Sequence, residues 1–240
     1  MNENIKETIK AFKVDLDSSK NQIMLKPIAR LSNNQAHQVN EVAEKIHELI
    51  KNAPYSNDNI ILNHNRIKEA FFSPFKPQLK NAQVFLSHSH ADINKALKAL
   101  EVKNYLENQI KRKVFIDSLF WDYKDNVLNK LAKYDDISRI EDAFTLILRE
   151  SLEDMIKKCP YFVFLQSSNS VSNQWLSRNQ DLLKITYSAW IYEELKIAHS
   201  ISESRPIPMM ESMQVFHDIS PFLESFETIT LKKLSQQINS

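Results

Sequence analysis

From residue 83 onward, short apolar runs alternate with longer amphipathic segments, a pattern typical of a parallel sheet covered by helices. The apolar runs predict strands at 83–89, 113–117, 161–168 and 205–210. The amphipathic segments predict helices at 91–110, 140–159, 188–201 and 220–238, with a loop over 118–123. The sequence therefore predicts an α/β fold with a central parallel sheet flanked by helices.

The first 80 residues have a different pattern of apolar and polar positions, and we expect them to be helical. An apolar stripe at helical spacing predicts a helix over 36–51, a second helix is expected over 60–72, and the proline-containing stretch 71–77 is expected to be an extended linker. We therefore divide the chain into an N-terminal helical extension, 1–80, and a domain, 81–240. The stripe must be buried, either against that domain or in an oligomer.

The predicted helix at 188–201 carries one polar residue in an unexpected place. At 100° per residue Glu194 falls among the apolar residues that surround it, one turn after Trp190, whereas Glu193 falls on the polar side. Burying a carboxylate without a partner is costly, so we expect Glu194 to line a pocket. The alternative is that Glu194 reaches the surface or pairs with a lysine.

Composition narrows the possible functions. The chain has 240 residues, 42% of them hydrophobic, and a net charge of +1, which gives no strong field to hold nucleic acid or a membrane surface. We find no apolar run of membrane-spanning length and no signal-peptide pattern, so we expect a cytoplasmic protein. Cys159 is the only cysteine, which excludes an intramolecular disulfide and a cysteine-rich zinc site.

The chain contains no glycine. A P-loop, a G-x-G-x-x-G dinucleotide fingerprint and a G-x-S-x-G nucleophile elbow each need glycine, because a Cβ atom would block the backbone conformation or the close approach of the ligand. A nucleotide site in this chain must therefore be built from side chains.

Four segments, taken in order, resemble the bacterial branch of the Toll/interleukin-1 receptor (TIR) family. VFLSHSHAD resembles the family's first strand and loop, KVFIDSLFW its second strand, and YFVFLQSSNSVSN its third strand and exit loop. SAWIYEEL resembles the W-x-x-x-E signature that places the family's catalytic glutamate, here at Glu194. The resemblance spans about 83–212. The connection between Ser168 and Ser188 is longer than usual, and the usual glycines after the second strand are missing.

The resemblance implies a flavodoxin-like TIR fold that cleaves the nicotinamide–ribose bond of NAD⁺, as a glycohydrolase or ADP-ribosyl cyclase. NAD⁺ would be the substrate, with no cofactor and no metal, and Glu194 the catalytic residue. It further implies a role in bacterial antiphage defence through NAD⁺ depletion or a cyclic ADP-ribose-type signal, homo-oligomers through TIR–TIR contacts, and an effector or sensor partner. The implied substrate-binding residues are Phe85, Ser87, His88, Asp117, Ser118, Trp121, Ser167 and Trp190.

Other interpretations remain open. The chain could be a TIR adaptor that associates with other TIR domains without chemistry, or a protein similar to nucleoside deoxyribosyltransferases. A hydrolytic triad of Ser87, His88 and Asp92 is disfavoured, because adjacent strand residues point to opposite faces. His88 and His90 lack a third metal ligand at sensible spacing, so a hydrogen-bonded surface pair is favoured. Packing is the alternative role for Trp190.

Overall fold

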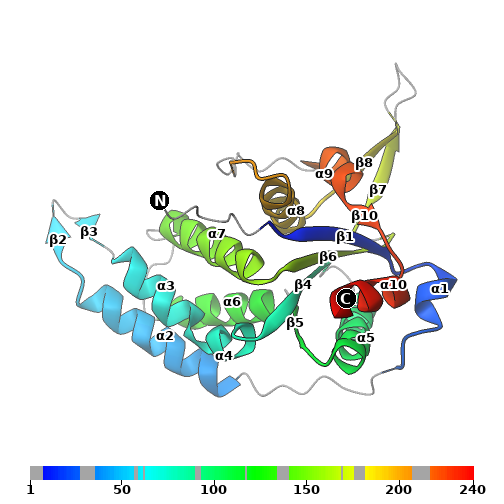
Figure 1. Cartoon of the computed structure of the whole chain (residues 1–240). Coiled ribbons are helices and arrows are strands. Elements are labelled where there is room, and N and C mark those ends of the chain that lie inside the picture. Colours follow the sequence, from blue (N-terminus) through cyan, green and yellow to red (C-terminus); the bar gives the residue numbers. More distant parts are fainter. Residues whose placement is uncertain are drawn as a thin grey trace, which may run out of the picture.

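Five parallel strands form the centre of the molecule (Figure 1). The computed structural model describes residues 8–27, 36–56, 59–61, 63–89, 93–116, 118–133, 141–168, 170–175, 182–206 and 217–240. The strand order is β10-β1-β6-β4-β5, and every neighbouring pair is parallel. The strands are β1 (Lys10–Asp15), β4 (Ala82–His88), β5 (Lys113–Ile116), β6 (Tyr161–Gln166) and β10 (Glu227–Thr228). The α/β class with a helix-flanked parallel sheet is confirmed, and the arrangement is consistent with a flavodoxin-like fold.

The N-terminal region contributes an interior strand, β1, to this sheet. The order β5-β4-β6 matches the first three places of the flavodoxin-like order 2-1-3-4-5, and the next two places are taken by β1 and β10. Phe12 and Val14 of β1 face one core, while Ala11 packs against the other. The expectation that residues 1–80 are helical is therefore wrong at β1, and the boundary at residue 80 does not coincide with a boundary of the hydrophobic core.

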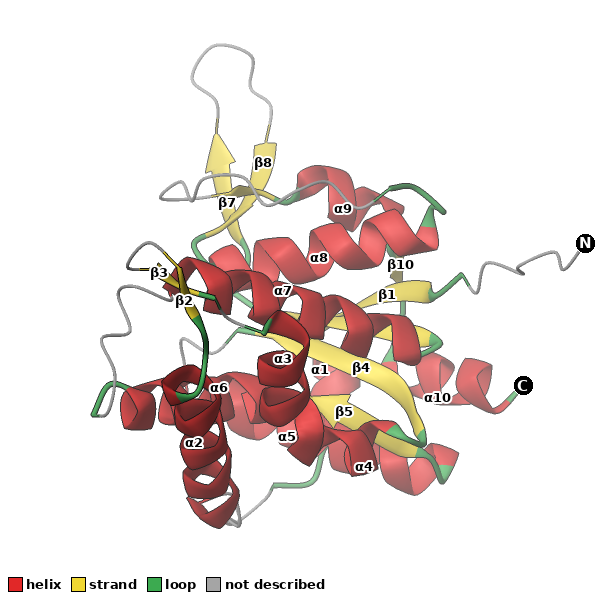
Figure 2. Cartoon of the chain, turned by 90° about the vertical axis from the view of Figure 1, so that its left-hand side faces the viewer, coloured by secondary structure: helices red, strands yellow, loops and turns green. Residues whose placement is uncertain are grey.

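Helices cover both faces of the sheet (Figure 2). On one face lie α5 (Ile93–Ile110) and α10 (Leu231–Asn239), whose apolar residues pack with Val84, Leu86 and Val163 of the strands. On the other lie α6 (Ser118–Leu131), α7 (Glu141–Lys158) and α8 (Ala189–Ser202), which pack around Phe85, Phe115 and Phe162. Alternate residues of each strand thus fill two separate cores.

The predicted helices near the N-terminus form an outer layer on this second face. Helix α2 (Ala36–Lys51) packs against α6 and α3 (His64–Phe72), and α3 packs against α7. The stripe from Val39 to Ile50 is buried within the larger core, so it docks against its own chain. The predicted extended linker is wrong: η1 (Ser73–Phe75) and α4 (Lys76–Leu79) occupy it, because its prolines stand in the first turns of these helices, where no N–H is needed.

Three further predictions need correction. The expected loop at 118–123 is the start of α6. The single helix expected at 220–238 is α9 (Ser220–Ser225), β10 and α10, with Thr230 capping α10 by accepting a hydrogen bond from Lys233 N. In the predicted strand 205–210, residues 207–210 lie outside the described residues, and 205–206 are not in a strand.

Smaller elements complete the chain. A second, antiparallel sheet contains β7 (Ser172–Trp175), β8 (Leu182–Thr186) and β9 (His217–Asp218), so the long connection before α8 carries two of its strands. The remaining elements are α1 (Ser19–Gln22) and the hairpin β2 (Tyr55–Ser56)–β3 (Asn59–Ile60). Among the described helices, none is both long and apolar enough to cross a membrane.

Candidate functional site

Helix α8 carries the predicted catalytic residue into the interior. Ser188 caps the helix by accepting a hydrogen bond from Ile191 N at 3.2 Å, and the helix packs against α7, β1 and β4. Glu194 is 1% exposed, in agreement with its place in the apolar arc. The carboxylate is thus held over the sheet, near the carboxyl end of β4.

A hydrogen bond joins this carboxylate to the central strand. Ser87 is the penultimate residue of β4 and is fully buried. Its hydroxyl donates a hydrogen bond to Oε2 of Glu194. Ser87 faces the same side of the sheet as Phe85, two residues earlier. The bond offsets part of the cost of burying the carboxylate and fixes its orientation. The sequence therefore identified two residues that meet in space although they are far apart in the chain.

The strand register places a cation on the same face of the sheet. Lys13 of β1 pairs with Phe164 of β6, which pairs with Ser87 of β4, so the three side chains form one row. The ammonium of Lys13 donates to the carbonyl oxygen of Leu223 in α9. Burial lowers the pKa of Lys13, with a further lowering by the positive charge of Lys184. The face that holds Glu194 thus also contains a partly desolvated ammonium.

Glu193 does not lie on an exposed polar face, and that expectation is wrong. It is 2% exposed and accepts hydrogen bonds from Nε of Arg149 on α7 and from Nζ of Lys196, each at 3.3 Å. The polar side of α8 is buried around Glu193 and Lys196, and α7 supplies one of the partners there. The spacing of Glu193 and Lys196 is a sequence signal for the local pair. No local signal points to Arg149.

Trp190 marks the first turn of α8. It is partly buried against the larger core, and Nζ of Lys124 on α6 lies 5.6 Å from the centroid of its ring. This geometry is a cation–π contact, which ties the start of α8 to α6. Packing thus accounts for Trp190 in this structure, and its contact with substrate stays a prediction.

Like Ser87, the proposed substrate contacts Phe85 and His88 lie inside the molecule. The ring of Phe85 is fully buried and stacks on Phe115 and Phe162, with centroids 5.6 and 5.7 Å away. Packing accounts for Phe85 in this structure, and its contact with substrate stays a prediction. His88 is buried as well, and its Nδ1 lies 2.8 Å from the carbonyl oxygen of Ser89. His88 is therefore not at the surface, as the favoured surface pair with His90 would require.

The exit of β6 forms a tight turn. Ser170 Oγ accepts a hydrogen bond from Ser167 N at 2.8 Å and donates to Ser167 O at 3.0 Å. The next amide, Ser168 N, donates to Oδ2 of Asp17 at 2.9 Å, which joins the carboxyl ends of β6 and β1. Ser167 is therefore at the predicted edge, held by its own turn.

The remaining predicted residues are described less fully. Asp117, His90 and Asp92 lie outside the described residues. Ser118 and Trp121 belong to the first turn of α6, of which the structure describes the backbone. Their roles as substrate contacts stay predictions.

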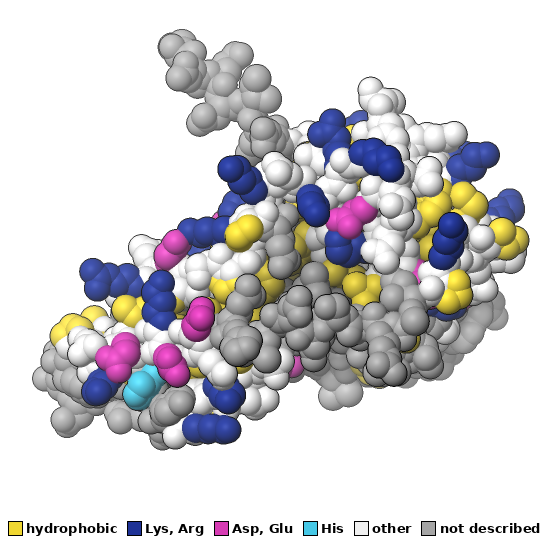
Figure 3. All heavy atoms as spheres, turned by 90° about the horizontal axis from the view of Figure 1, so that it is seen from below, with side chains coloured by type: hydrophobic (Ala, Val, Ile, Leu, Met, Phe, Trp, Pro, Cys, Tyr) yellow, Lys and Arg dark blue, Asp and Glu magenta, His cyan; other side chains and the backbone are white. Residues whose placement is uncertain are grey.

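Neither the cysteine nor a metal cluster offers another reactive centre in the part of the chain that the structure describes. Burial raises the pKa of the Cys159 thiol to about 12, so the reactive thiolate is scarce at neutral pH. Among the described residues, no group of three or more histidine, cysteine, aspartate or glutamate side chains could hold a metal ion. On the face shown in Figure 3, lysine and arginine side chains are spread among other types of residue rather than gathered in one patch.

Comparison with family models, with curated proteins and with solved structures finds no match to this chain. The interpretation of the site consequently depends on the residues and their geometry. The feature that stands out is the buried pair formed by the hydroxyl of Ser87 and the carboxylate of Glu194.

Proposed function

We propose that the chain cleaves the nicotinamide–ribose bond of NAD⁺, with Glu194 as the catalytic carboxylate. The observation that supports this most directly is the buried Ser87–Glu194 pair near the carboxyl end of β4, the edge at which open α/β sheets bind ligands. The W-x-x-x-E resemblance and the β5-β4-β6 order point in the same direction.

A single carboxylate suits this reaction. Nicotinamide leaves NAD⁺ as a neutral ring, so the leaving group needs no general acid. The ribose carbon acquires positive charge as the bond breaks, and an anion held beside it in a site with little water stabilises that charge. The hydrogen bond from Ser87 would orient the carboxylate of Glu194. Water or a nitrogen of the adenine ring then accepts the ribosyl group, giving ADP-ribose or a cyclic product.

Burial of the carboxylate adds a conformational requirement. Since Glu194 is 1% exposed, substrate reaches it after a local opening of the structure around α8. Contacts between copies of the chain, or with a sensor protein, could favour the open form. A defence enzyme that stays idle until it assembles would have this property. The proposal thus extends to an NAD⁺-consuming role in bacterial antiphage defence.

The test is to incubate the purified chain with NAD⁺ over a wide range of protein concentrations and to separate nicotinamide, ADP-ribose and cyclic products. Glu194→Gln keeps the size of the side chain and an acceptor for Ser87, and we expect it to lower nicotinamide release by about 100-fold or more. Ser87→Ala removes the hydroxyl that donates to Glu194 and should lower nicotinamide release about tenfold. Glu203→Gln, at the exposed end of the same helix, is the matched control.

Three results would redirect or overturn the proposal. Self-association without release of nicotinamide at any concentration would favour the adaptor function. Cleavage of deoxynucleosides but not NAD⁺ would favour a deoxyribosyltransferase-like activity. Unchanged turnover by Glu194→Gln would remove Glu194 from the mechanism.

A further inference from the structure

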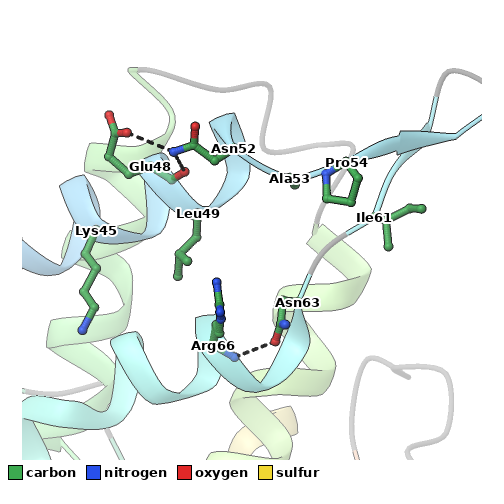
Figure 4. Close-up of a pocket in the computed structure, with 9 residues that line it drawn as sticks. All are labelled: Lys45, Glu48, Leu49, Asn52, Ala53, Pro54, Ile61, Asn63 and Arg66. Atoms are coloured by element: carbon green, nitrogen blue, oxygen red, sulfur yellow. Dashed lines mark hydrogen bonds between the residues drawn. The ribbon is translucent and has the colours of Figure 1, made fainter.

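A cavity of about 370 Å³ lies between the C-terminal end of α2 and the start of α3 (Figure 4). Its outer wall is the chain around Pro54 and Ile61, on either side of the β2–β3 hairpin. None of its lining residues belongs to α8 or to the central sheet. The volume falls within the range of small-molecule sites, about 300–1,000 Å³. This cavity is therefore a place where a ligand unrelated to Glu194 could bind.

Two cationic side chains of the described residues line the cavity, and neither has a close anionic partner in the part of the chain that the structure describes. Within the described residues, the side chains of Arg66 and Lys45 form no ion pair and no hydrogen bond. Lys45 acts on Glu69 at longer range, but that carboxylate is already bonded to Lys76. The guanidinium of Arg66 rises from α3 toward α2, into the space between the two helices (Figure 4).

Among the described lining residues, the one carboxylate is already engaged. Oε2 of Glu48 lies 3.3 Å from Nδ2 of Asn52, and Oε1 lies 3.9 Å from Nζ of Lys51. Figure 4 shows this carboxylate on the side of α2 away from Arg66. The cavity therefore has an excess of positive charge, which favours an anion.

Apolar side chains form another part of the wall, beside Asn52 and Asn63. Leu49 points from α2 toward Arg66, and Pro54 and Ile61 lie on the opposite side (Figure 4). Ile61 is 52% exposed, which makes it one of the large hydrophobic side chains left open to solvent in the described part of the chain. A ligand with an apolar body would remove this surface from water.

We propose that the cavity binds a small anion with an apolar body, of the class of aromatic or short-chain carboxylates and phosphate monoesters. The guanidinium of Arg66 would take two oxygens of the head group in a bidentate contact, and Lys45 would add a second charge. Leu49, Pro54 and Ile61 would cover the body. The proposal stands independently of the reaction at Glu194, because it uses none of the residues of that site.

Nuclear magnetic resonance titration of the full chain tests this proposal. The probes are phenyl phosphate, benzoate, inorganic phosphate, which has the charge alone, and benzyl alcohol, which has the apolar body alone. We expect saturable amide shifts around Leu49, Ile61 and Arg66 with at least one of the two aromatic anions, at millimolar Kd. Each of the other two probes should bind about tenfold more weakly, because each lacks half of the recognised chemistry.

Three variants separate the contributions. Arg66→Gln should weaken the aromatic anions by about tenfold or more, because a charge-assisted contact is lost. Ile61→Ser should weaken the aromatic anions and leave inorganic phosphate unchanged. Arg112→Gln changes an exposed arginine outside this cavity and is the control. No saturable shift up to about 20 mM, equal affinity for inorganic phosphate and phenyl phosphate, or an equal loss in Arg112→Gln would overturn the proposal.

Discussion

Replacing Glu193 by glutamine should destabilise the protein far more than the same change at its neighbour Glu194. Glu193 is the acidic partner of Arg149 and Lys196, whose side chains are 14% and 4% exposed. Removing one member of a buried ion pair costs about 3–5 kcal/mol, because the other charge stays buried. Glutamine keeps the volume and an acceptor oxygen, and Arg149 still lies 4.0 Å from Glu153. We therefore expect Glu193→Gln to lower the free energy of unfolding by about 3 kcal/mol, the lower end of this range.

Urea unfolding measures this difference directly. For Glu193→Gln the midpoint should fall at an unchanged slope, and the melting temperature should fall by about 6–12 °C, at about 2–4 °C per kcal/mol for a chain of this size. Glu194→Gln should change the free energy of unfolding by about 1 kcal/mol or less, because it relieves a buried charge and keeps an acceptor for Ser87.

A double variant checks the physical cause. Glu193→Leu combined with Lys196→Met replaces two of the three charges with apolar volume, and Arg149 keeps Glu153 at 4.0 Å, so the double variant should recover part of the loss. A loss below about 1 kcal/mol in Glu193→Gln, or an equal loss in Glu194→Gln, would show that the ion pair does not hold α8 to α7 as argued.

Three further outcomes follow from the fold. The hydroxyl of Tyr123 is buried with no hydrogen-bond partner among the described residues, so Tyr123→Phe should stabilise the protein by about 1 kcal/mol in urea unfolding; a loss of stability would reveal a partner. Burial lowers the pKa of His199, so the unfolded chain binds a proton first as pH falls below about 6.5, and stability should decline from there. His199→Gln should flatten that decline in thermal scans, and an unchanged slope would exclude His199 as its cause. Deleting residues 1–16 removes β1 from between β6 and β10, so cooperative unfolding should be lost, and a truncated chain that still melts cooperatively would contradict this.

The elements that could be predicted are those whose signal is local. The strands β4, β5 and β6 are compact apolar runs, and α2, α5, α7 and α8 have long periodic patterns, so each was located to within a few residues. The strand β10 has two exposed residues, and β1 is a short alternating segment, so neither signals its place in the sheet. The prolines of 71–77 suggested extended chain, yet they fit the first turns of helices.

The residues of the site also divide into those with a local sequence signal and those without one. The burial of Glu194 followed from helical phase, because its neighbours on that side are apolar. The burial of Glu193 did not, since the phase argument assumes that one side of the helix faces water. Residues of α7 occupy that side instead, and Arg149 is distant in sequence from Glu193. Its contribution could be seen only once the two helices were placed together.

The position of β1 shapes the order in which the fold can be completed. Lys10 pairs with Tyr161 and Phe12 with Glu227, so β1 has neighbours in the sheet that are synthesised much later than β1 itself. At about 5–20 residues per second, β1 waits for several seconds or longer before β6 exists. Such non-local pairing slows folding, and until β10 arrives the edge of β1 is open to pairing with another chain. Nascent chains of this protein should therefore be prone to aggregate or to engage chaperones until the region around residue 228 has emerged.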